Sequence, residues 1–142
     1  MMKKFQGLIL ALVVSLPLVA NARITREDLE LYIPYSADLI GQLRACSKFD
    51  QESMRYDNAA RDTEVALYKY MRASNLVSGD YPDVVVGKVS VMQQIELGQL
   101  QLHQRTDPGE ITKVCQKAEL SARRHIVLLL EGIDAHLRGK KK

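Results

Sequence analysis

Apolar residues recur at steps of three and four along the last part of the chain, from residue 111 to residue 137. This spacing predicts one long amphipathic helix whose apolar stripe faces a core. Asp107 before Pro108 is typical of a helix start, and Gly139 followed by three lysines is typical of a helix end. The stripe comprises Ile111, Val114, Cys115, Ala118, Ala122, Ile126, Leu129, Ile133 and Leu137.

The segment from Thr25 to Cys46 has helical spacing too, but a proline interrupts it. Thr25 followed by Asp28 predicts a helix start. Pro34 has no N–H to donate to the preceding turn, so we expect it to end or kink a short leading helix. The piece that follows is expected to turn Leu43 and Cys46 inward.

Two segments lie between these. Residues 50–77 are more polar but keep helical spacing, and the sequence SGDYP then predicts a turn. Residues 84–91 are rich enough in valine to form a strand, but no second convincing strand is available to pair with them. We therefore favour a helix, in which one face would carry Gly98 and allow a neighbouring helix to approach closely. That face consists of Val84, Val91, Ile95, Gly98 and Leu102.

Together these segments predict an all-α fold, a compact bundle of about four main helices with a short leading helix. We expect a single helical domain over residues 23–138 and a basic tail over residues 139–142.

Residues 1–22 have the layout of a cleavable signal peptide. Lys3 and Lys4 precede a short apolar run, and Ala20-Asn21-Ala22 is a typical cleavage site. The run of about 13 apolar positions is too short to span a bilayer, which needs roughly 20. We therefore expect an exported, periplasmic protein without stable membrane insertion.

The chain has two cysteines, Cys46 and Cys115, 69 positions apart. In an oxidising compartment such a pair in a small domain indicates a disulfide. Neither has a second metal-binding residue close by, as a zinc site would require. We predict one intramolecular disulfide between them.

Charge excludes one class of partner. The formal net charge falls from +3 to +1 once the leader with its two lysines is removed. Much of the remaining positive charge is in the tail at Lys140, Lys141 and Lys142, so nucleic acid is not an expected partner. Whether that tail contacts lipid is left open.

Candidate chemistry is sparse. The histidines are His103, His125 and His136, and the last two would lie about 16 Å apart along one helix, too far to share a metal ion. Phosphate-binding glycine loops and a Gly-x-Ser-x-Gly elbow are missing from the sequence. We expect no catalytic residues, no metal and no cofactor, and hence not an enzyme.

Binding is the function that remains. The best candidate for a recognition tip is the turn at residues 78–83, where Asp80, Tyr81 and Asp83 combine acidic and aromatic character. The leading hypothesis is a binding protein, such as an immunity protein that inhibits a secreted toxin. A periplasmic chaperone or envelope-assembly factor is the first alternative, and a small-ligand carrier or an enzyme with a site inside the bundle is the second. The partner's identity and the oligomeric state are left open.

Overall fold

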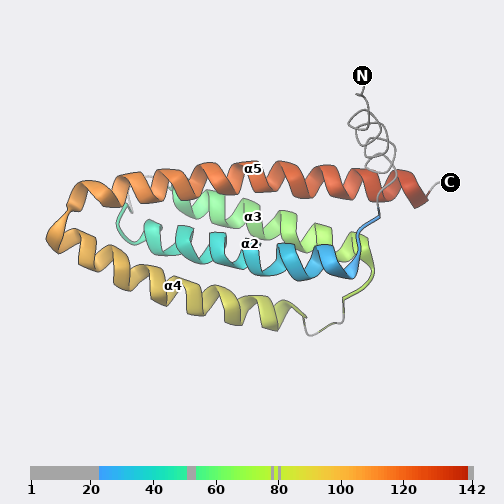
Figure 1. Ribbon diagram of the computed structural model, residues 1–142, viewed down its shortest axis with the longest axis horizontal. Helices are drawn as coiled ribbons and strands as arrows, with labels where there is room; N and C mark the ends of the chain where they lie inside the picture. Colours follow the sequence, from blue (N-terminus) through green and yellow to red (C-terminus); the bar gives the residue numbers. More distant parts are fainter. Residues whose placement is uncertain (1–22, 51–53, 78, 80, 141–142) are drawn as a thin grey trace, which may run out of the picture.

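The computed structural model describes residues 23–50, 54–77, 79 and 81–140. Within these ranges the chain forms four α-helices and no strand (Figure 1). They are α2 (Arg26–Ser47), α3 (Arg55–Ser74), α4 (Tyr81–Thr106) and α5 (Pro108–Lys140). The predicted all-α bundle is confirmed. The predicted signal peptide lies outside the described residues, as do Lys141 and Lys142 of the basic tail.

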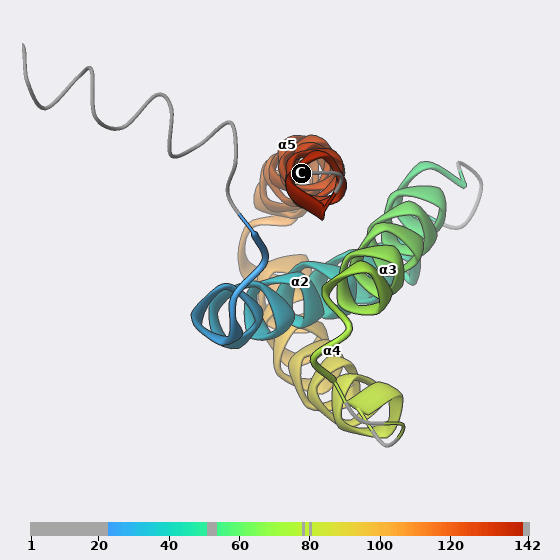
Figure 2. The ribbon, with the colours of Figure 1, turned by 90° about the vertical axis from the view of Figure 1, so that its right-hand side faces the viewer.

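Helix α2 is the centre of the bundle and packs against each of the other three. Viewed along the bundle, α5 and α4 lie on opposite sides of α2, while α3 lies beside α2 (Figure 2). Helices α2 and α4 run in the same direction (Figure 1). Since α4 packs mainly on α2 and less on α5, the described part of the chain leaves much of the α4 surface uncovered.

The core lies around α2 and receives side chains from all four helices. Ile40, Leu67, Leu100 and Leu129 have no exposed surface and come from α2, α3, α4 and α5 respectively. Burying one such side chain stabilises the fold by roughly 2 kcal/mol. The predicted inward positions of α2 are confirmed, because Leu43 and Cys46 are also fully buried.

The start of α2 is the predicted one. The Asp28 backbone N–H donates to the Thr25 hydroxyl, and the Thr25 N–H donates to the Asp28 carboxylate, which completes a capping box.

A separate leading helix that ends at Pro34 is not found among the described residues, because α2 continues through the proline to Ser47. An internal proline costs about 3 kcal/mol. Leu29 and Ile33 are both buried on the core side of the same turns, and their burial offsets that cost.

Residues 84–91 are helical, as favoured, but the face expected to contact a neighbour was wrong. Val85 and Val89 are the buried valines of this stretch, whereas Val84 and Val91 are exposed. A Cβ added at Gly98 would meet no atom within 4 Å. The contact face is therefore rotated by about one residue, or 100°, from the expected one.

The predicted disulfide is present between Cys46 and Cys115, whose Cα atoms lie 5.8 Å apart. Both cysteines are buried. The bond ties the last turns of α2 to the first turns of α5. Helix α5 begins at Pro108, as predicted, and continues through Gly139 to Lys140, slightly beyond the expected end.

Candidate functional site

A small polar cluster lies in the core between α2 and α5. The Ser36 Oγ donates to the Tyr32 carbonyl at 2.6 Å and also lies 2.6 Å from the His125 Nε2. Because the serine proton is directed to that carbonyl, His125 is the donor through an Nε2–H. The Tyr35 ring packs edge-on to the His125 ring at a centroid distance of 4.8 Å. Burial lowers the pKa of His125 to about 4, so this imidazole is neutral at physiological pH.

This cluster is not arranged for nucleophilic catalysis. A serine nucleophile must donate its proton to the histidine, but Ser36 receives a hydrogen bond from His125. Both side chains are also buried, with 0% and 4% of their surface exposed, so no substrate can reach the hydroxyl. The cluster serves instead to join α2 and α5 across the core.

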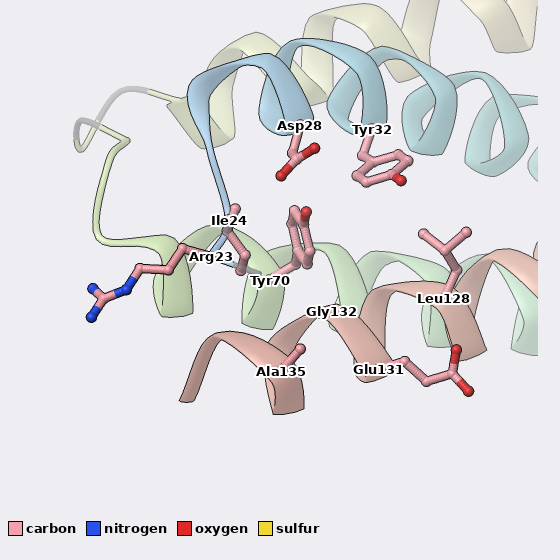
Figure 3. Close-up of a pocket in the computed structure, with 9 residues that line it drawn as sticks. All are labelled: Arg23, Ile24, Asp28, Tyr32, Tyr70, Leu128, Glu131, Gly132 and Ala135. Atoms are coloured by element: carbon pink, nitrogen blue, oxygen red, sulfur yellow. The ribbon is translucent and has the colours of Figure 1, made fainter. Parts of the chain in front are cut away.

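A pocket of about 240 Å³ lies where the first described residues meet the last turns of α5 (Figure 3). The His136 Nδ1 accepts the Ile24 backbone N–H at 3.0 Å, which fixes that end of the chain. Tyr70 projects from α3 toward Asp28 and Tyr32 on α2 (Figure 3). The lining residues are Arg23, Ile24, Asp28, Tyr32, Tyr70, Leu128, Glu131, Gly132 and Ala135.

The chemistry of this pocket is modest. Burial and the nearby Asp28 raise the pKa of Tyr70, so its phenol stays neutral. The Asp28 carboxylate is already engaged in the cap of α2. Gly132 leaves room for the Tyr70 ring, because a Cβ there would lie 2.9 Å from Tyr70 Cε1. These groups explain the local packing and form no catalytic set.

A larger depression lies on the other side of the molecule, between α2 and α4. It consists of two adjoining hollows of about 380 and 590 Å³ that share Pro34, Val84 and Lys88. We call it the α2–α4 groove. The first hollow also includes Leu29, Glu30, Ile33 and Tyr81, and the second also includes Asp38, Asp83, Gly87, Val91 and Met92.

The α2–α4 groove has an acidic rim. Three carboxylates, Glu30, Asp38 and Asp83, face one cation, Lys88. In the part of the chain that the structure describes, none of the three forms an ion pair or a hydrogen bond. Burial raises the pKa of Asp38, and the charge of Lys88 opposes that shift. The rim therefore holds negative charge that the fold leaves largely uncompensated.

The rest of the surface is different. Arg55 on α3 pairs with Glu119 on α5 at 2.6 Å, and Arg123 on α5 pairs with Asp62 on α3 at 2.7 Å. Among the described residues, every ion pair involves α2, α3 or α5, and none involves α4. The groove is thus a place where three acidic side chains without ion pairs gather beside a single cation.

An apolar line runs along α4 beside the groove. Its members are 45–61% exposed, and the positions between them on the same face include Gly87, Lys88 and Gly98. Helix α5 also exposes large apolar residues, but charged residues such as Arg124, Glu131 and Asp134 interrupt them. We call the α4 residues the α4 stripe: Val84, Val91, Ile95 and Leu102.

The residues predicted from the sequence as a recognition tip are partly placed at the groove. Tyr81 lines the first hollow and Asp83 lines the second, both in the first turn of α4 rather than in a turn between helices. Asp80 lies outside the described residues. Their role in binding remains a prediction. Sequence reasoning missed Pro34, Asp38 and Lys88, because only the packing of α2 on α4 brings them together.

Within the described ranges, no three histidine, cysteine or acidic side chains converge so that they could hold a metal ion. No helix in those ranges combines the length and the apolar character needed to cross a bilayer.

Comparison of the chain with protein-family models, with curated proteins and with solved structures gave no match.

Proposed function

We propose that this protein is exported to the periplasm and works by binding another protein through the α4 stripe and the adjoining α2–α4 groove. The observation that carries the proposal is the exposure of Val84, Val91, Ile95 and Leu102 along one face of α4. Exposed apolar side chains that gather on one face, here with Lys88 among them, mark interaction sites more often than scattered ones do.

The export part of the proposal has separate support. Disulfides persist in oxidising compartments and are rare in reducing ones. The bond between Cys46 and Cys115 is buried in the core of this small domain, so it is a structural bond. Together with the signal-peptide pattern of residues 1–22, it favours the periplasm.

Within the class of binding proteins, inhibition of a secreted toxin is the role we favour over a chaperone role. Valine and isoleucine, which supply three of the four stripe residues, have few rotamers and present a preformed surface. A preformed surface suits one partner, whereas promiscuous binders use flexible side chains that repack. A carrier role is less well supported. The pocket beside Tyr70, of about 240 Å³, is smaller than most ligand sites, and the larger hollows of the α2–α4 groove lie along the surface rather than inside the bundle.

The proposal can be tested by placing a photo-crosslinking amino acid at Val91 in the exported chain. Val127 on α5 is the matched control, because it is also an exposed valine, at 53% against 61%. We expect position 91 to crosslink to one discrete envelope protein or toxin and position 127 not to.

The crosslinked protein would then be purified and its affinity measured directly. Replacing Val91 and Ile95 by lysine should abolish binding, since both are at least half exposed and contribute little to the fold. A natively folded chain that gives the same crosslinks at both positions, or none at position 91, would refute the proposal.

A further inference from the structure

The chemistry of the α2–α4 groove identifies the kind of segment that can fill it. Its floor is apolar, with Leu29 and Ile33 from α2 and Val84, Val91 and Met92 from α4. A long apolar groove between two helices fits the apolar face of a third helix. The two hollows join end to end along α2 and α4, so an occupant would lie along the helices rather than enter a closed cavity.

The charged residues at the rim of the groove indicate the charge that the polar side chains of the occupant should carry. Glu30, Asp38 and Asp83 border the floor without ion-pair partners among the described residues, and Lys88 is the one cation of the groove. A basic side chain at the edge of an incoming helix would compensate this charge. An acidic one would add to the repulsion.

Pro34 supplies a second, independent observation. It lies in both hollows and has no N–H, so the Glu30 carbonyl one turn earlier does not receive its usual helical hydrogen bond. Because Glu30 is exposed, water or a donor from a bound segment can hydrogen-bond to that carbonyl. Lysine and arginine side chains carry only donors, so a basic flank satisfies the carbonyl as well as the carboxylates.

The same charges disfavour two other occupants. In a symmetric dimer the same surface of both copies would meet, and each copy would bring three carboxylates and one lysine into the interface. This excess of negative charge on both sides is unfavourable, so a second copy of this chain fits less well than a basic segment. An anionic lipid surface would be repelled for the same reason.

We infer that the α2–α4 groove receives an amphipathic helix with basic flanks that belongs to the partner protein. This inference rests on the proposed function and adds the chemical class of the bound segment. Apolar residues of that helix would cover the floor between Pro34 and Val91, and its lysines or arginines would reach Glu30, Asp38 and Asp83.

The test uses the mature disulfide-bonded chain and two labelled synthetic helical peptides. Both carry leucines on one face, with lysines on the flanks of the first and glutamates on the flanks of the second. In fluorescence anisotropy we expect the basic peptide to bind at least tenfold more tightly than the acidic one. The preference should shrink as salt is raised, because the contacts lie at the surface. Equal affinities would overturn the inference.

Charge variants locate the site. Asp38→Asn with Asp83→Asn should weaken binding of the basic peptide about fivefold. Lys88→Gln should strengthen it, since Lys88 repels the incoming cations. The matched control is Glu27→Gln with Glu131→Gln, two exposed acids outside the groove, and it should change nothing. An equal loss of peptide affinity in both double variants would overturn the inference. It would also be overturned if the chain formed a dimer or bound anionic vesicles, and the Asp38 and Asp83 substitutions altered that dimer or that binding.

The two proposals can fail separately. Crosslinking at Val91 to a native partner, combined with no preference for the basic peptide, would leave the proposed function intact and refute the basic helix.

Discussion

Gly41 on α2 lies directly against Met92 on α4. A Cβ built at Gly41 would lie 2.7 Å from Met92 Cβ and 2.9 Å from the Gln93 backbone nitrogen. No side chain fits at that distance, so the two helices are in near backbone contact at this point. The small residue that permits their close approach is on α2, and Gly98 on α4 has no such role.

The first prediction follows from this contact. Gly41→Ala should lower the free energy of unfolding by about 1–3 kcal/mol, because the added methyl must displace α4. Gly98→Ala is the matched control and should raise the free energy of unfolding by up to about 1 kcal/mol, since alanine favours a helix and nothing obstructs it. Urea unfolding followed by circular dichroism measures both, and the packing described here predicts opposite signs.

Adjacent valines on α4 give the second prediction. Val85 is fully buried and Val84 is 45% exposed. Val85→Ala should cost about 2 kcal/mol of stability through the cavity it leaves, whereas Val84→Ala should change stability by less than about 0.5 kcal/mol. Thermal unfolding of the two variants and the wild type measures both changes in stability. Similar losses would show that α4 packs with a different face toward α2.

The third prediction concerns the disulfide. Replacing Cys46 and Cys115 by alanine should lower the free energy of unfolding by about 4 kcal/mol, because the bond closes a loop of 69 residues in the unfolded chain. Urea unfolding with and without dithiothreitol measures the effect. Once the buried bond is reduced, dithiothreitol should lower the urea concentration at the unfolding midpoint of the wild-type chain. It should leave the midpoint of the double variant unchanged. A wild-type midpoint indifferent to full reduction would contradict the prediction.

The fourth prediction is a pH dependence from His125. Its ordinary pKa of 6.5 applies to the unfolded chain, and burial lowers it to about 4 in the folded chain. Between these values the unfolded chain binds a proton that the folded chain does not, so stability falls as the pH falls through this window. The expected loss is about 1–3 kcal/mol.

Unfolding at pH 7, 5.5 and 4 measures this dependence. The control is His125→Gln, which keeps a donor for Ser36 and does not titrate. The difference in the free energy of unfolding between wild type and variant should become smaller as the pH falls. A constant difference would show that His125 is protonated equally in the folded and unfolded chains.

Much of the fold could be predicted, for identifiable reasons. The long stripe from Ile111 to Leu137 follows a helical period over its whole length, so α5 was unambiguous. With two cysteines there was one possible pairing. The expected helix end at Pro34 is absent because the rule for an isolated helix gives the cost of a proline but not the burial of Leu29 and Ile33 that offsets it.

The candidate site was harder to predict. Helix α4 has two apolar faces, one with Val85 and Val89 and one with Val84 and Val91. The sequence of α4 alone does not show which of the two packs on α2. The face that packs contacts a residue far away in the chain, Gly41, which lies against Met92. The contact of Ser36 with His125 spans 89 positions and carries no local signal either. Tyr81 and Asp83 could be proposed from the sequence because turn chemistry is local, and their role stays a prediction. Asp38 and Lys88 were missed because they meet only in the folded bundle.

The bond between Cys46 and Cys115 encloses α3 and α4 in a covalent ring. A protease that nicks the chain anywhere inside the ring would produce two polypeptides, each holding one of the paired sulfurs. Neither piece could diffuse away, so the helix with the exposed valines would stay on its scaffold after cleavage. On a non-reducing gel the nicked protein would migrate as a single species and would separate only when a thiol is added.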